Sequence, residues 1–454
     1  MARSALSIQA TDLSAIRNID DQQDRWLRKL ARTSDLDARV IRLSGGSSEA
    51  AEPIVRFDAQ SGTWWTGRYV GEVIHQGGRL TIAPRFGVAQ LQRWLSRIWG
   101  VRLLSSKGKY EHSRLWLWEL LGRLWEAQLL AGAKHGLPTR RVDRIHRGQA
   151  LRGRLDVRMT AREIATGRGT LVSRSRERLI DRQISTILLS AFEQLRRRLD
   201  QLADPRSWMS PRGQTIVQEF QSHGADHGGE AISSLRSPVR YTPITQSYQP
   251  VVDLSLSILK NRPLSSSAEG QSDVMGVLID MAEVWELYVY HLLRSSLIGS
   301  RVLHTGRCSE RADALFQSDR TGQTLGRLKP DILITDLDSE TVRAVLDAKY
   351  KSTKPADTRP YGVHREDLYQ INAYVSAFGS PGKTVSGALI YPSGAKGFEI
   401  GRLQVDSPWR SLNHDASVWL LGIDCQSDTL NGEGLTDGED GFLRSVRAMT
   451  GVSE

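Results

Sequence analysis

Two aspartates and a lysine lie beside two short apolar runs in the stretch 329–351. Asp331 comes directly before Ile-Leu-Ile, Asp347 directly follows Ala-Val-Leu, and Lys349 stands two positions later. Carboxylates are preferred ligands of Mg²⁺, which can activate a water molecule and stabilise both the attacked phosphate and its leaving oxygen. These residue types at this spacing therefore indicate a metal-dependent phosphodiesterase site.

The two apolar runs predict a pair of buried strands, and the polar residues 336–340 between them predict a turn. Such a hairpin places Asp331 at the start of one strand beside Asp347 near the end of the next. Side chains alternate along a strand, so Asp347 and Lys349 share a face. We expect Lys349 to orient the water or neutralise phosphate charge, and the Ala348 carbonyl to be a further metal ligand. The alternative is a surface hairpin with an incidental Asp-x-Lys triplet.

Two helical patterns flank this hairpin. Residues 275–293 form an amphipathic pattern that contains Glu286, and residues 366–378 form another, in which Gln370 and Tyr374 share a face four positions apart. An apolar run at 385–391 predicts a further strand. The order helix, hairpin, helix and strand is typical of an α/β fold.

These residues carry a resemblance. Pro330-Asp331 with Asp347-Ala-Lys349 resembles the signature of the PD-(D/E)xK nuclease superfamily, and Gln370-Ile-Asn-Ala-Tyr374 is similar to the motif of its RecB-like branch. The sequence of residues 278–289 resembles that of McrC, the nuclease subunit of the McrBC modification-dependent restriction system. Weaker similarities to McrC cover residues 69–86, where Arg85 replaces the usual Lys, and residues 151–156. Residues 1–50 match no pattern of that family.

The resemblance implies a DNA endonuclease with a C-terminal mixed sheet flanked by helices, preceded by an α+β docking region. Asp331, Asp347 and the Ala348 carbonyl would bind Mg²⁺, with Mn²⁺ as an alternative. Glu286 would be a third carboxylate, or it would instead cap or pair within the helix packing. Gln370 would position the site or contact DNA, whereas Tyr374 is expected to pack. The family's partner is McrB, a ring-forming AAA+ GTPase that recognises the modified base and is stimulated by McrC.

Positive charge is concentrated in one segment. The whole chain carries +10. Residues 140–182 hold thirteen arginines, no lysine and five acidic residues, an excess of eight positive charges. Arginine forks suit phosphate oxygens, so Arg152 and Arg154, together with Arg85 further upstream, are candidates for contact with DNA or the ring. The alternative is a solvated face, which we prefer for residues 196–198 because residues 179–199 have a regular apolar stripe.

Composition favours a cytoplasmic protein. Cys308 and Cys425 lie far apart in the sequence and suggest neither a disulfide framework nor a metal cluster. The N-terminus lacks the apolar core of a secretory signal, and no run is long enough to span a membrane. We therefore expect DNA and a protein ring as partners, and no membrane.

The expected organisation has four parts. Residues 1–60 form an N-terminal extension of unknown role, and residues 61–240 form the docking region, which begins with a hairpin at 63–85. Residues 241–272 contain a helix and a linker, and residues 273–454 form the nuclease domain. Within the docking region we expect helices at 88–99, 113–133 and 179–199, and a loop or junction at 204–238.

Two tempting motifs are rejected. Residues 377–384 fit a loose Walker A pattern, but such a loop follows a strand and precedes a helix, whereas here the order is reversed. We interpret it as a helix-to-strand turn, and the chain as one that hydrolyses no nucleotide. His223 and His227 flank Gly224 and are expected to be loop residues rather than metal ligands.

Two other functions stay open at the level of sequence. The chain could be a stand-alone RecB-like repair or recombination nuclease, because the Gln-x-x-x-Tyr motif occurs in that branch. It could also be a non-catalytic activator of an NTPase. Intact Asp331, Asp347 and Lys349 argue against the second alternative, because a degenerate subunit would have lost at least one of them.

Overall fold

A computed structural model describes most of the chain and divides it into two compact units. The first comprises Met1–His112 with Pro263–Glu454, and the second comprises Ser113–Arg262. This division differs from the expected one, because the N-terminal residues share a unit with the C-terminal part. The described residues are 6–33, 40–41, 52–99, 116–200, 208–222, 238–260, 274–305, 314–339, 341–355, 362–379, 385–395, 397–398, 400–412, 416–426, 430–432 and 434–451.

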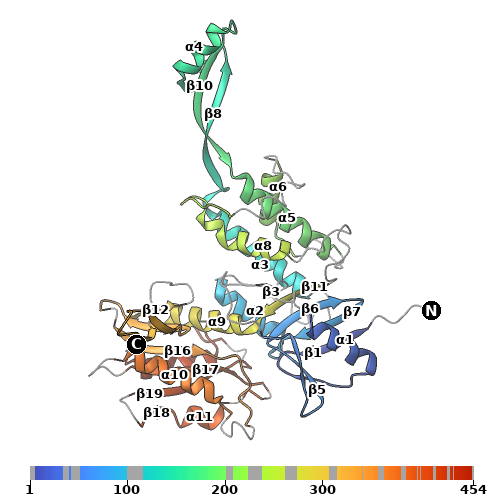
Figure 1. The fold of residues 1–454 in the computed structure, drawn as a ribbon, viewed down its shortest axis with the longest axis vertical. Helices are drawn as coiled ribbons and strands as arrows, with labels where there is room; N and C mark the ends of the chain where they lie inside the picture. The colour runs from blue at the N-terminus through green and yellow to red at the C-terminus, as the bar shows by residue number, and fades with distance from the viewer. Residues whose placement is uncertain are drawn as a thin grey trace, which may run out of the picture. The chain divides into compact units, whose positions relative to one another are not determined.

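The N-terminal part of the first unit contains a five-stranded sheet in the order β1-β7-β6-β11-β3 (Figure 1). The expected hairpin is confirmed as β6 (Tyr69–His75) and β7 (Gly78–Ala83). Gly77 turns it with a φ of +77°, a region that favours glycine. The remaining strands are β1 (Ser7–Thr11), β3 (Val40–Ile41) and β11 (Val274–Asp280).

One expectation for these segments was wrong. Residues 275–280 were expected to begin a helix, but they belong to β11, which pairs antiparallel with β6. An apolar run beside a helix does not reveal which of the two elements it joins. The N-terminal extension, to which the sequence assigned no role, supplies β1, which pairs in parallel with β7. The extension is therefore part of the fold.

A second, smaller sheet has the order β2-β5-β4. Its strands are β2 (Ala15–Ile16), β5 (Thr63–Thr66) and β4 (Val55–Asp58). Helix α1 (Asp21–Ala31) begins with a capping box between Asp20 and Gln23, and its buried face packs against one side of this sheet. The other side of the sheet is therefore left uncovered by α1.

The C-terminal part is built on a six-stranded mixed sheet in the order β12-β15-β16-β17-β19-β18. The predicted hairpin is confirmed, since β15 (Ile332–Asp336) pairs antiparallel with β16 (Val342–Ala348). The strand β16 then pairs in parallel with β17 (Ser386–Ser393), and β17 with β19 (Ser417–Asp424). The edges are β12 (Ser300–His304) and β18 (Trp409–Arg410).

Helices cover both faces of this mixed sheet, as Figure 1 shows for α9 and α10. Helix α10 (Arg365–Phe378) packs on β16 and β17 through Ile371, Tyr374 and Val375, which join Leu333, Val345 and Leu389 in one buried cluster. On the opposite face lie α9 (Met281–Ser296) and α12 (Asp437–Thr450). The α9 indole of Trp285 donates to the Ile390 carbonyl of β17 at 3.1 Å. The expected α/β class is confirmed.

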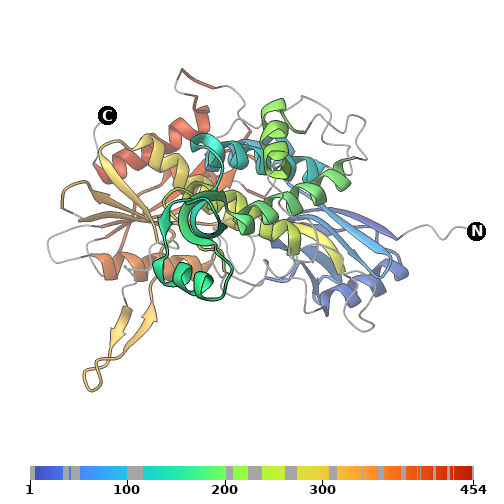
Figure 2. The same ribbon diagram turned by 90° about the horizontal axis from the view of Figure 1, so that it is seen from above.

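Smaller elements complete this unit. Helix α2 (Gly87–Trp99) contacts α9, and α11 (Gly401–Val405) lies on β19. The hairpin of β13 (Ala314–Gln317) and β14 (Thr324–Arg327) projects from the sheet region (Figure 2). The Walker-like residues fall between α10 and β17, as expected for a helix-to-strand connection, although residues 380–384 themselves lie outside the described part.

The second unit combines helices with a long hairpin. Its helices are α3 (Trp116–Gly132), α5 (Arg182–Leu199), α6 (Pro211–Ser222) and α8 (Gln249–Lys260). The prediction of a loop at 204–238 was wrong for residues 211–222, which form α6. His223 and His227 lie outside the described residues. None of the helices in the described part of the chain is long and apolar enough to cross a membrane.

The basic segment forms an arm of this unit. Strands β8 (Thr139–Gly148) and β10 (Leu171–Ile180) pair antiparallel along their whole length, and Figure 1 shows them extending away from the helices. Strand β9 (Arg154–Leu155) and helix α4 (Val157–Ala165) lie toward its far end. Most residues of both long strands are exposed or half-buried, which explains why the sequence shows little apolar periodicity there.

Asp280 joins the two parts of the first unit, because it ends β11 and caps α9. Its carboxylate accepts from the Ala282 N–H at 2.9 Å and lies 3.0 Å from the Arg68 guanidinium. We expect Asp280→Ala to lower the free energy of unfolding by about 2 kcal/mol, roughly 1 kcal/mol of it from the lost cap and the rest from the weaker pairing of Arg68, which keeps only Glu52 at 3.5 Å. Urea unfolding measures this change. Asp280→Asn retains a cap acceptor and should recover about 1 kcal/mol; equal losses would exclude a capping contribution.

Candidate active site

The hairpin of β15 and β16 brings Asp331 and Asp347 together at one end of the mixed sheet. Asp347 is the penultimate residue of β16 and is 1% exposed. Asp331 comes directly before β15, and its Oδ2 accepts from the Ala348 N–H at 2.7 Å. Both aspartates continue the side of the hairpin that carries Leu333 and Val345, because side chains two positions apart share a face. The sequence-predicted pair of carboxylates is thus assembled in the fold.

Lys349 and Gln370 extend this pair into a chain of polar contacts. The Lys349 Nζ lies 2.5 Å from the Asp347 Oδ2 and donates to the Gln370 Oε1 at 2.9 Å. The Gln370 amide donates to the Tyr374 hydroxyl at 2.7 Å, and this hydroxyl donates to the Lys329 carbonyl at 3.0 Å. Tyr374 is buried, as expected, but it also anchors Gln370. Helix α10 therefore holds the lysine against the carboxylates.

Glu286 approaches the same site from α9, but it has a second partner. Its Oε1 lies 2.8 Å from the Nε2 of His304, and 29% of its side chain is exposed. His304 is the last residue of β12, and no sequence pattern predicted that this buried histidine would lie beside Glu286. Both interpretations of Glu286 therefore have a structural basis: it reaches the site and it pairs within the packing.

The electrostatics of the site depend on burial. Burial, reinforced by the negative charges of Glu286 and Asp347, raises the pKa of Asp331 well above its usual range. Burial acts to lower the pKa of Lys349, but the carboxylates of Asp347 and Asp331 outweigh it and raise that pKa overall. Lys349 therefore remains cationic at neutral pH, and its charge stabilises the buried carboxylates beside it.

The donor set fits a hard divalent cation. Asp331, Asp347, the Ala348 carbonyl and Glu286 offer only oxygen ligands, and Mg²⁺ needs no more than one or two carboxylates because it retains several waters. The Asp347 Oδ2 is buried and makes no aligned hydrogen bond among the described residues, despite its close contact with Lys349. Across the described ranges, no three His, Cys, Asp or Glu side chains converge closely enough to hold a metal ion by themselves. Glu286 therefore does not close a three-carboxylate cage.

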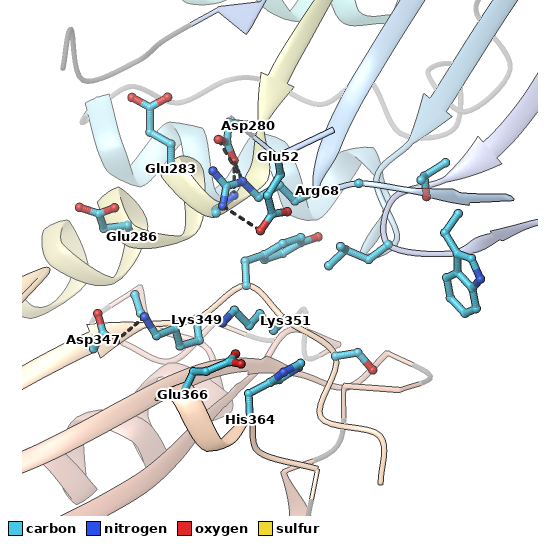
Figure 3. Close-up of a pocket in the computed structure, with 18 of the residues that line it drawn as sticks. Glu52, Arg68, Asp280, Glu283, Glu286, Asp347, Lys349, Lys351, His364 and Glu366 are labelled. Atoms are coloured by element: carbon cyan, nitrogen blue, oxygen red, sulfur yellow. Dashed lines mark hydrogen bonds and ion pairs between the residues drawn. The ribbon is translucent and has the colours of Figure 1, made fainter. Parts of the chain in front are cut away.

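The site opens into a cleft of about 2120 Å³ within the first unit. Figure 3 shows Asp347 and Lys349 on one side of this cleft, and Glu52, Arg68 and Asp280 on the other. Residues from the two N-terminal sheets thus face the candidate catalytic residues. The sequence did not predict this wall, because contacts between residues some 300 positions apart leave no periodic signal.

Arg85 lies inside this wall. Its guanidinium donates to the Leu13 carbonyl at 2.6 Å and to the Asp12 carbonyl, and it stacks 4.4 Å from the centre of the Phe398 ring. Only 11% of its side chain is exposed. The structure gives Arg85 a packing role and not the expected contact with DNA or the ring. Arg152 and Arg154 are exposed on the arm of the second unit.

The mixed sheet, its flanking helices and the paired aspartates define an α/β protein with two carboxylates close together at one end of its sheet. Residues 65–392 match the family described as McrBC 5-methylcytosine restriction system component. The chain therefore belongs to the McrBC family, and its resemblance to McrC is confirmed.

One solved structure agrees with this assignment at the level of the fold. The chain is 16% identical to a chain of a complex described as Thermococcus gammatolerans McrB AAA+ hexamers with bound McrC, with a TM-score of 0.54 over 98% of this chain and 100% of that one. A second structure of the McrBC complex from that organism gives 16% identity and a TM-score of 0.39 over 66% of this chain and 89% of that one, too low to support an argument. No curated protein matches the sequence.

The raised pKa of Asp331 predicts how stability depends on pH without metal. A carboxyl group with a raised pKa keeps its proton in the folded protein at pH values where the unfolded chain has lost it, so stability falls as pH rises above about 3.9 toward the folded value. We expect Asp331→Asn, which removes this charge, to flatten that fall and to unfold at a higher temperature near neutral pH. Thermal unfolding in a chelator measures it, and an unchanged pH profile would contradict the assignment.

Proposed function

We propose that this chain is the Mg²⁺-dependent DNA endonuclease subunit of a McrBC-type restriction system and acts in the cytoplasm. The observation that carries the proposal is the convergence of Asp331, Asp347 and Lys349 at one end of the sheet, inside a cleft of about 2120 Å³. Membership of the McrBC family supports the restriction role. The order of Asp331, strand β15 and strand β16, with Asp347-Ala-Lys349 at the end of β16, supports assignment to the PD-(D/E)xK superfamily.

The division of labour within the site follows from its contacts. A bound Mg²⁺, or Mn²⁺ in its place, would supply an activated water and charge stabilisation for phosphodiester hydrolysis. Asp331, Asp347 and the Ala348 carbonyl would hold the ion. Lys349, kept cationic by the two aspartates, would place its charge beside the scissile phosphate.

Two further residues would tune this site. Gln370 holds the Lys349 ammonium through its Oε1 and is itself fixed by Tyr374, so it acts as a positioning residue. Glu286 would serve the metal through an intervening water and would remain paired with His304. A water-mediated role fits both observations on Glu286: it lies near the two aspartates, yet no three metal-ligating side chains converge among the described residues.

We further propose that the chain acts with a McrB-like AAA+ GTPase ring and stimulates it. The structure from Thermococcus gammatolerans with a similar fold contains McrB AAA+ hexamers with bound McrC. The arm of β8 and β10 is the candidate docking element, because it is narrow, arginine-rich and exposed on both faces. Recognition of modified DNA would belong to the ring.

The other functional classes can be separated experimentally. A stand-alone nuclease would cleave DNA fully without a ring partner, whereas a restriction subunit should depend on it. A non-catalytic activator would stimulate GTP hydrolysis but never cleave. The intact carboxylates and lysine favour the nuclease over the activator.

The catalytic assignment predicts that Asp347→Ala lowers the cleavage rate by at least roughly 1000-fold, because the metal loses a ligand that stabilises developing charge. Lys349→Ala should lower kcat by about 100-fold with little change in Mg²⁺ affinity, because it removes one charge and no ligand. Cleavage of plasmid DNA in the presence of the ring partner and titration calorimetry with Mg²⁺ measure both effects. Stimulation of GTP hydrolysis is the control for folding, and unchanged cleavage by Asp347→Ala would refute the site.

The docking assignment predicts that Arg152→Glu with Arg154→Glu weakens binding to the ring or DNA by about 10-fold and flattens its salt dependence. These two arginines form no ion pair with a described residue. Arg168→Glu is the matched control, since Arg168 lies on the same arm but pairs with Glu163 at 3.7 Å. Binding measured by fluorescence anisotropy at several salt concentrations tests this. If Arg168→Glu weakened binding as much as the double variant does, the arm would act only as a nonspecific charged surface.

A further inference from the structure

The small sheet β2-β5-β4 presents one of its faces to the candidate active site. In its register, Trp65 lies opposite Ala15 on one neighbouring strand and opposite Arg56 on the other, so these three residues share a face. All three line the cleft, as does Arg17, two residues after Ala15. The alternate residues, including Ile16 and Trp64, point into the buried core with α1.

Among the described residues, the cations of this face make no close ion pair, although the Arg56 charge helps to lower the pKa of Asp58. Neither Arg17 nor Arg56 forms an ion pair with a described residue, and both are exposed. The acidic residues nearby are already engaged. Asp58 accepts from the Ser61 hydroxyl at 2.6 Å and the Gln60 N–H at 3.1 Å, and Glu52 lies 3.5 Å from Arg68. Two guanidinium groups are thus left available beside a half-buried indole that also lines the cleft.

This face is fixed to the strand that carries the catalytic residues. Tyr350, which directly follows Lys349, donates its hydroxyl proton to the Asp12 carboxylate at 2.8 Å. Asp12 also accepts from the Arg85 N–H at 2.6 Å, and the Arg85 side chain holds the next carbonyl, that of Leu13. Both Asp12 and Tyr350 are buried. The segment before β2 is therefore tied to the residues that follow β16 by a continuous set of buried and half-buried hydrogen bonds.

We propose that Arg17, Arg56 and Trp65 form the second wall of the DNA channel, opposite the metal-binding wall. The two guanidinium groups contact phosphates of the DNA that enters the cleft, and the indole stacks on a nucleotide base. Available arginines beside a half-buried indole that lines the cleft suit this polymer, because arginine forks match phosphate oxygens and every base offers a π surface. The proposal rests on the nuclease function proposed above and assigns its substrate contacts to the N-terminal region.

The charge contacts can be tested apart from catalysis. Full-length protein carrying Asp347→Ala, which cannot cleave, is titrated into a fluorescent DNA duplex over a range of salt concentrations. Adding Arg17→Gln with Arg56→Gln should weaken binding about 10-fold and reduce the salt slope by about 1.8, the value expected for two lost phosphate contacts. The matched control is Arg25→Gln with Lys29→Gln, two exposed cations of α1 outside the cleft, which should bind as the parent does.

The aromatic contact is tested with single-stranded DNA. Trp65→Ala should weaken binding of the single strand roughly 10-fold, and Trp65→Phe should restore most of it, because a stacking surface is what matters. A variant that folds poorly would fail in both forms, whereas loss of stacking affects only the alanine form, and circular dichroism checks the folding of each.

The outcomes separate this proposal from the nuclease function. Unchanged DNA affinity for the arginine pair and for Trp65→Ala would overturn the second wall, while Asp347-dependent cleavage would still stand. Equal weakening by the α1 control would also overturn it, because the effect would then be general charge. Retained DNA affinity with lost binding to the AAA+ ring would assign this face to the protein partner and overturn the DNA contact.

Discussion

Two buried carboxylates that lie side by side repel each other, and the contacts around them offset that repulsion. Asp331 and Asp347 are both removed from water, and Lys349 supplies a single positive charge 2.5 Å from Asp347. Such a pair is unfavourable in an empty site and favourable when a divalent cation neutralises it. The contacts around it, from the Ala348 N–H to Gln370 and Tyr374, hold the groups in place against this repulsion. The carboxylate pair therefore lowers the stability of the metal-free fold at the place where a cation would bind.

The repulsion between the two carboxylates also explains why N-terminal residues share the first unit with the C-terminal part of the chain. A strand end that carries an unfavourable charge pair needs rigid support, and it receives this support from residues distant in sequence. Tyr350 contacts Asp12, Asp280 joins β11 to α9, and Trp285 of α9 reaches the Ile390 carbonyl next to the catalytic strand. The N-terminal sheets are thus part of the cleft, and the expected boundary between a docking region and a nuclease domain does not follow the packing of the chain.

Local pattern was sufficient to predict the elements that hold the candidate site, but not the elements that enclose it. The hairpin of β15 and β16, helix α10 and the shared face of Gln370 and Tyr374 follow from apolar runs and from helical or strand periodicity over fewer than about twenty residues. The pairing of β1 with β7, the strand β11 and the contact between Asp12 and Tyr350 depend on partners far away in sequence. His304 beside Glu286 is of the same kind, because a single histidine at the end of a strand gives no pattern.

The arginines of the arm illustrate why composition alone did not locate an interface. Several of them pair with acidic residues of the same arm, as Arg174 does with Asp156 at 2.7 Å and Arg144 with Glu177 at 3.1 Å. Exposed pairs of this type contribute little stability, but they occupy guanidinium groups that the sequence counts as available. The excess of eight positive charges in residues 140–182 therefore resolves into paired arginines along the strands and unpaired ones such as Arg152 and Arg154. What matters for recognition is which cations remain unpaired after folding, and the same argument distinguishes Arg56 from Arg68 in the cleft.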